Sequence, residues 1–211
     1  MMARPFHKLL RFRRDESGAT LVELALVMPL LLILMFGFID FARLGFTYVM
    51  TGKAMDRAVR MAVVLTPPCP NVPVVNARGT FSVSGLRFGT ACSANDDLCE
   101  DTGVASCALD GTHPTSATIW ASIQPLMPTN ASGRNVELSY EFTADLGFLG
   151  GPYTPIVTAR ITDLDFQFIT PLGALAGLVG ASNSTEFKTS FTFPSMSASL
   201  PAEALSDGEL S

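Results

Sequence analysis

The chain has 211 residues, of which 48% are hydrophobic and only 16% charged, a balance that favours a membrane segment or deep burial. Residues 1–60 carry nine Lys and Arg against five Asp and Glu, a net charge of +4, and the remainder carries five against fourteen, a net charge of −9. An acidic body repels phosphates, so this balance argues against nucleic acid as a partner.

The first predicted element is an apolar run from Ala19 to Ile39, which as a helix has the length of one hydrocarbon core. The run is longer and more uniform than a secretory h-region, and no A-x-A cleavage pattern follows it, so we expect a retained anchor. Pro29 lies inside the run and predicts a kink. Basic residues next to an apolar run stay in the cytoplasm. The orientation is therefore N-terminus inside and body outside, set by Arg4, Lys8, Arg11, Arg13 and Arg14.

Glu23 is the one charged side chain within this run, and a carboxylate at that depth in a membrane helix is costly. The residues alone leave three interpretations open. Glu23 snorkels to the headgroups, or it pairs within the chain with Arg13 or Arg14. In the third interpretation the chain is cut after Gly18, and Glu23 of one subunit neutralises the new amine of Ala19 in another.

Helical periodicity continues beyond the apolar run to about residue 65. Small and apolar side chains recur there in steps of four and three, and form a seam of Phe41, Gly45, Tyr48, Gly52, Met55, Val59 and Ala62. The seam predicts packing either on the chain's own domain or on another molecule. The stretch TPPCP (66–70) ends the pattern. We expect one helix over about 19–65, roughly 70 Å long.

Beyond the prolines, residues 69–110 indicate a loop-rich region with at most one weak hairpin around 81–88. A short helix is predicted over 116–127. The apolar stretch 172–180 fits a short helix or a loop, and the acidic tail 201–211 is expected to be disordered. Alternating patterns predict strands at 135–142, 156–169 and 186–193. The predicted fold class is α+β: a long N-terminal helix, first transmembrane and then amphipathic, followed by a small antiparallel-sheet domain.

The four cysteines all lie in the loop-rich region, outside the membrane in the expected orientation: Cys69, Cys92, Cys99 and Cys107. An even number in an oxidising compartment indicates two disulfides, for which three pairings are possible. The alternative is a metal site that includes His113. Zinc ligands usually pair as C-x₂₋₄-C, and gaps of six and seven residues fit that spacing poorly.

No pattern in the sequence predicts catalysis. His113, the only histidine of the body, precedes a proline in a Gly/Thr loop, where an exposed structural histidine is ordinary. Asp163 and Asp165 alternate with apolar residues as on any half-solvated strand, and the spacing of Asp96 and Asp97 matches no calcium loop. No P-loop, GxSxG or HExxH motif is present. We therefore expect no enzyme, and no catalytic, cofactor-binding or metal-binding residue.

The stretch RRDESGATLVELALVMP (13–29) resembles the N-terminus of type IV prepilin-like proteins, and more specifically of TadE-like proteins of tight-adherence (Flp/Tad) pilus systems. The matching features are a short basic leader ending in Gly18, the small Ala19, Glu23 as the fifth residue after the leader, and Pro29. FGFIDFARLGFTYVMTGKAMDRAVRMAV (36–63) resembles the continuation of that family. Leu24 departs from it, because family members usually have an aromatic residue after the glutamate.

The resemblance implies cleavage between Gly18 and Ala19 by a membrane-embedded prepilin peptidase, with Glu23 as the assembly charge. It implies a minor pseudopilin in the bacterial inner membrane that assembles with other pilins and the pilus assembly platform, and that has no cofactor. The implied organisation is a cytoplasmic leader 1–18, a membrane helix 19–40, an amphipathic extension 41–65, a periplasmic domain 66–200 and the tail 201–211. The competing hypothesis is a membrane-anchored periplasmic binding domain, whose tether needs neither Glu23 nor cleavage.

Overall fold

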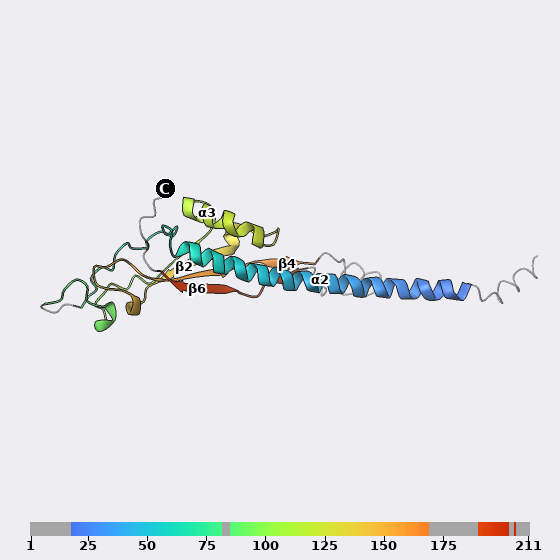
Figure 1. The fold of residues 1–211 in the computed structure, drawn as a ribbon, viewed down its shortest axis with the longest axis horizontal. Helices are drawn as coiled ribbons and strands as arrows, with labels where there is room; N and C mark the ends of the chain where they lie inside the picture. Colours follow the sequence, from blue (N-terminus) through green and yellow to red (C-terminus); the bar gives the residue numbers. More distant parts are fainter. Residues whose placement is uncertain (1–17, 82–84, 169–189, 203–204, 206–211) are drawn as a thin grey trace, which may run out of the picture.

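The computed structural model describes residues 18–81, 85–168, 190–202 and 205. Its longest element is one continuous helix, α2 (Ala19–Ala62), about 65 Å long at 1.5 Å per residue. A small domain packs beside the second half of α2, and the first half projects beyond the other described elements (Figure 1). The prediction of a single helix through the apolar run and its amphipathic extension is confirmed.

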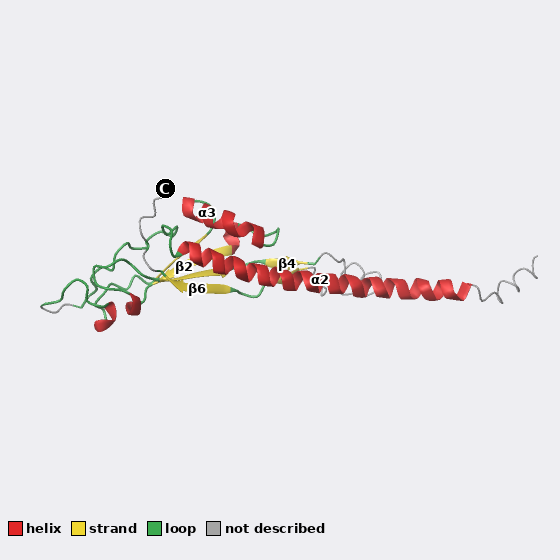
Figure 2. Cartoon of the chain, in the orientation of Figure 1, coloured by secondary structure: helices red, strands yellow, loops and turns green. Residues whose placement is uncertain are grey.

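Four strands form an antiparallel sheet in the order β1-β2-β3-β6, and two more form a separate ribbon (Figure 2). The sheet strands are β1 (Val104–Ala108), β2 (Val136–Glu141), β3 (Ile156–Ile161) and β6 (Ser197–Pro201). The ribbon pairs β4 (Asp165–Gln167) with β5 (Ser190–Thr192). A second helix, α3 (Pro114–Ile123), lies against α2 and is followed by the 3₁₀ turn η3 (Gln124–Leu126). Further single 3₁₀ turns are η2 (Cys92–Ala94), η4 (Gly133–Asn135) and η5 (Ala144–Leu146). The predicted α+β class is confirmed.

The core lies between α2 and one face of the sheet. Alternate side chains of the two central strands point into it: Val136, Leu138, Tyr140, Val157, Ala159 and Ile161. The helix meets them with a face of mostly small side chains: Ala54, Met55, Ala58, Val59 and Ala62. Alanine at every fourth position allows the sheet to approach the helix backbone closely, because residues four apart share one face.

The predicted strand 156–169 is divided into two strands that belong to different sheets. Asp163 separates them with a φ of 50°, a left-handed conformation that aspartate tolerates better than most residues. The Asn135 side chain holds this turn, since its amide nitrogen donates to the carbonyls of Thr162 (3.3 Å) and Asp163 (2.9 Å). The prediction of one continuous strand was wrong at this corner.

Two strands and one boundary were not predicted. β1 falls inside the loop-rich region, and β6 consists of small residues around Leu200 and ends on Pro201. Ala202 and Leu205 are then buried in the main core, so the predicted acidic tail begins within the folded domain. The apolar stretch 172–180 and Phe187 lie outside the described residues. Residues 81 and 85–88 are not in strands.

The buried Tyr140 predicts a loss of stability in alkali. Its hydroxyl donates to the carbonyl of Ala62 (3.4 Å) and joins β2 to the last turn of α2, and burial raises the pKa of Tyr140 far above 10. The unfolded chain releases this proton near pH 10 and the folded chain does not, so the contribution to stability is complete below pH 10. Above it, the free energy of unfolding falls by up to about 1.4 kcal/mol per pH unit.

Urea unfolding between pH 8 and pH 12 measures this slope. Tyr140→Phe should make the slope shallower, leaving a smaller part from Tyr153, whose pKa is also raised, chiefly by burial. Tyr48→Phe is the control, because the side chain of Tyr48 is 48% exposed on α2. An unchanged slope in Tyr140→Phe would contradict the assignment.

Candidate functional site: the exposed surface of the long helix

The first half of α2 is apolar on all sides and packs against nothing in the described structure. Its large side chains between Leu21 and Ile39 are all 44% or more exposed. The helix is long and apolar enough to cross a membrane, and it is the one such helix among the described residues. A helix that is hydrophobic all round requires an apolar environment, which lipid supplies.

The predicted processing and assembly residues lie together at the start of this helix. Gly18 immediately precedes α2, Ala19 is its first residue, and no side chain caps this end. Glu23 follows one turn into the helix with an exposed side chain. Pro29 is inside α2, which continues through it. Arg13 and Arg14, the intrachain partners considered for Glu23, lie outside the described residues.

A charged pair marks the point at which the domain first contacts the helix. The carboxylate of Asp40 is 3% exposed and lies 3.4 Å from the guanidinium of Arg43, one turn further along α2. Arg43 in turn lies over the ring of Phe166 in β4, 5.7 Å from its centroid. Arg43 thus connects the helix to the β4–β5 ribbon through its contact with Phe166, where the apolar run ends. Sequence analysis did not identify this role, although the i,i+3 spacing of Asp40 and Arg43 is a signal for it.

The predicted seam on α2 divides into two parts. Met55, Val59 and Ala62 are buried against the sheet, as the intramolecular interpretation requires. Phe41 and Tyr48 are 70% and 48% exposed, so this half of the seam does not face the domain. Between residues 40 and 51, the side of α2 that faces the domain is displaced by one residue from the predicted seam. It consists of Asp40, Leu44, Thr47 and Thr51. Polar residues at three of these four positions concealed the inward face from a search for apolar periodicity.

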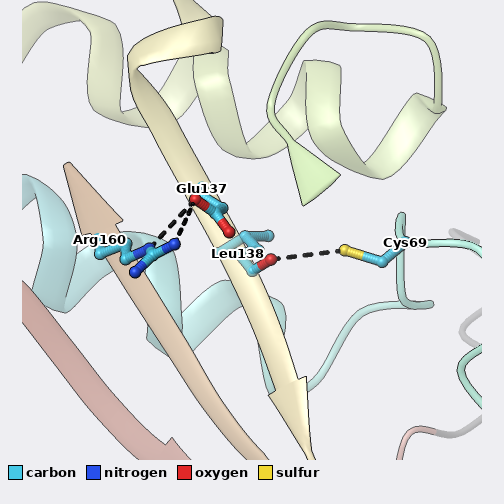
Figure 3. A network of polar contacts seen from close by, with 4 residues as sticks. All are labelled: Cys69, Glu137, Leu138 and Arg160. Carbon is cyan, nitrogen blue, oxygen red and sulfur yellow. Dashed lines mark hydrogen bonds and ion pairs between the residues drawn. The ribbon is translucent and has the colours of Figure 1, made fainter. Parts of the chain in front are cut away.

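The two predicted disulfides are present, and their pairing is Cys69–Cys107 and Cys92–Cys99. Cys69 Sγ lies 3.7 Å from the carbonyl oxygen of Leu138 beside the exposed Glu137–Arg160 ion pair (Figure 3). A disulfide sulfur carries no hydrogen, so this approach is a packing contact and no hydrogen bond. All four cysteines are in disulfides, so none of them has a free thiol to bind a metal together with His113.

The second disulfide stabilises the loop-rich end of the domain. Cys92 and Cys99 form a small separate core with Leu98 and Leu149. The buried Asn76 connects the surrounding loops, because its side-chain nitrogen donates to the carbonyl of Pro152 (3.0 Å). This end lies furthest from the projecting half of α2 (Figure 1).

The residues considered for chemistry have structural positions. His113 is the N-cap of α3, and its Nδ1 accepts a hydrogen bond from the backbone N–H of Thr115 (3.2 Å). Asp163 and Asp165 are exposed, as are Asp96 and Asp97. In the part of the chain that the structure describes, no three His, Cys, Asp or Glu side chains come together as a metal site.

Residues 18–60 match the family model of TadE-like proteins. The matched segment begins at the residue before α2, contains Glu23, Pro29 and the Asp40–Arg43 pair, and ends two residues before the helix does. The sheet domain lies outside it. No curated protein and no solved structure matches the chain. The TadE-like N-terminal segment is thereby confirmed, and its apolar helix supports single-pass membrane anchoring.

Proposed function

We propose that this chain is a minor pseudopilin, a structural subunit of a tight-adherence pilus or of its secretion apparatus. The observation that carries the proposal is the match of residues 18–60 to TadE-like proteins, on a helix that begins at Ala19. In this role the first half of α2 anchors the subunit in the bacterial inner membrane. The disulfide-bonded domain faces the periplasm, where thiols are oxidised.

Cleavage by a prepilin peptidase between Gly18 and Ala19 would explain why this membrane helix contains Glu23 despite the cost of burying a carboxylate in lipid. Cleavage gives Ala19 a free ammonium group at the start of the helix, where the helix dipole already disfavours a positive charge. The Glu23 carboxylate of a neighbouring subunit compensates for both the desolvation of this ammonium group and its unfavourable interaction with the helix dipole. Glu23 is exposed at the surface of α2, so it is accessible to such a neighbour.

A plain membrane tether for a periplasmic binding domain is the second candidate. A tether requires an apolar helix of sufficient length and nothing more, so neither Gly18 nor Glu23 has a role in it. The two candidates therefore differ in whether the first 18 residues are removed.

The mature N-terminus tests the proposal. Intact mass of protein purified from its native membrane should correspond to a chain that starts at Ala19. Gly18→Leu should keep the leader, because a bulky residue before the cleaved bond blocks access of the peptidase. Gly37→Leu is the matched control and should be cut normally, since an added side chain has open space at both positions. A wild-type chain that starts at Met1 would favour the tether.

A further inference from the structure

The outward face of α2, on the side opposite the domain, stays apolar beyond the length of a membrane. Phe38, Phe46 and Val49 on this face are 68%, 67% and 55% exposed. From Leu21 to Val49 the helix rises about 42 Å, whereas a hydrocarbon core is about 30 Å thick. About 12 Å of apolar surface therefore extends past the bilayer on the domain side.

The bilayer cannot readily bury this additional apolar surface of α2. Tilting a 42 Å stretch into 30 Å requires about 45°, beyond the 0–40° range of transmembrane helices. Deeper insertion would draw the Asp40–Arg43 pair into hydrocarbon. It would also draw in β4, because Phe166 of β4 contacts Arg43. The neighbouring Asp165 and Gln167 are exposed, so they would lose their hydration. Among the described residues, the chain's own domain covers only the opposite side of the helix. The excess surface is therefore available to a protein partner.

Charge indicates the chemistry of this partner. Immediately beyond the apolar stretch, the exposed side chains of α2 include Lys53, Arg57 and Arg60, with Asp56 as the only acidic residue among them. Within the described residues no ion pair closer than 4.0 Å neutralises these three basic groups. The outward face is therefore apolar up to Val49 and carries a net charge of +2 from Lys53 to Arg60.

We propose that the face formed by Phe38, Phe46, Val49, Lys53, Arg57 and Arg60 docks a different membrane-anchored subunit. The helix of that subunit leaves the bilayer alongside α2, apolar first and then acidic. A second copy of this chain fits poorly, because a two-fold axis along the membrane normal places identical residues at equal height. Lys53, Arg57 and Arg60 would then face their own copies. The proposal rests on the proposed function in taking α2 as a membrane helix among other anchored subunits.

Photo-crosslinking in the native membrane tests the proposal. A benzophenone derivative of phenylalanine replaces Phe46 in the full chain, and the same derivative at Phe148, 55% exposed in a distal loop, is the positional control. The adduct at position 46 should contain a different protein, whose peptide sequence shows one span followed by Asp or Glu residues. The triple variant K53E/R57E/R60E should reduce this adduct about tenfold. The control R78E/R87E changes exposed loop arginines and should leave it unchanged.

Reversal of the partner's acidic residues to lysine should restore the adduct with the triple variant. An adduct of two copies of this chain, no protein adduct, or an adduct insensitive to K53E/R57E/R60E would each overturn the proposal. Intact mass of the same samples shows separately whether the chain starts at Ala19. A failed interface is therefore distinguishable from a failed pseudopilin assignment. Disulfide-dependent gel migration confirms that each variant has folded.

Discussion

In cells that assemble the pilus, Glu23→Ala should remain in the membrane and fail to assemble. Removing the carboxylate takes away the one charged group on the apolar half of α2, so insertion becomes no less favourable. The ammonium of Ala19 on the neighbouring subunit then loses its partner. Leaving one charge of a desolvated pair uncompensated costs about 3–5 kcal/mol, more than a hundredfold in the association constant.

Two further substitutions separate charge from shape. Glu23→Gln keeps the size and polarity of the side chain without the charge and should fail as Glu23→Ala does. Glu23→Asp keeps the charge on a shorter side chain and should assemble partially. Membrane fractionation measures insertion, and the amount of sheared surface pili measures assembly. Normal piliation in Glu23→Gln would exclude charge pairing as the role of this residue.

The helix could be predicted from the sequence because its signals are local. The apolar run, the seam from Met55 onward and the prolines at 67–68 each act within a few residues, and together they placed α2 to within three residues of its end. The TadE-like segment is also local, since its recognition rests on Gly18, Glu23 and Pro29 in sequence. These features depend on spacing along one chain segment, which a sequence displays directly.

The sheet and the inward face of α2 were less accessible because they depend on distant partners. β1 has little alternation of its own and becomes a strand through its pairing with β2 and the bond from Cys107 to Cys69. Asp40 has no apolar character, yet it is buried beside Arg43, whose guanidinium lies over Phe166 of β4. Which of the three disulfide pairings forms is likewise a property of the folded domain, and spacing did not determine it.

The two disulfides should contribute unequally to stability. Cys69–Cys107 closes a separation of 38 residues and joins the chain just after α2 to the edge strand β1. Cys92–Cys99 closes a separation of 7 within the distal loops. Loop-closure entropy assigns about 4 kcal/mol to the first and about 2.4 kcal/mol to the second. C69A/C107A should therefore lower the free energy of unfolding considerably more than C92A/C99A.

Denaturant unfolding of the detergent-solubilised full chain measures the difference through Trp120, the only tryptophan, which packs against the main core from α3. Each double variant is the control for the other, because each replaces both cysteines of one disulfide and so leaves no free thiol. The position of the bonds sharpens the test. Loss of Cys69–Cys107 frees β1 beside the core that Trp120 reports, whereas loss of Cys92–Cys99 loosens the separate cluster around Leu98 and Leu149. Equal losses would show that loop length does not govern these bonds, and that local strain or residual structure in the unfolded chain does.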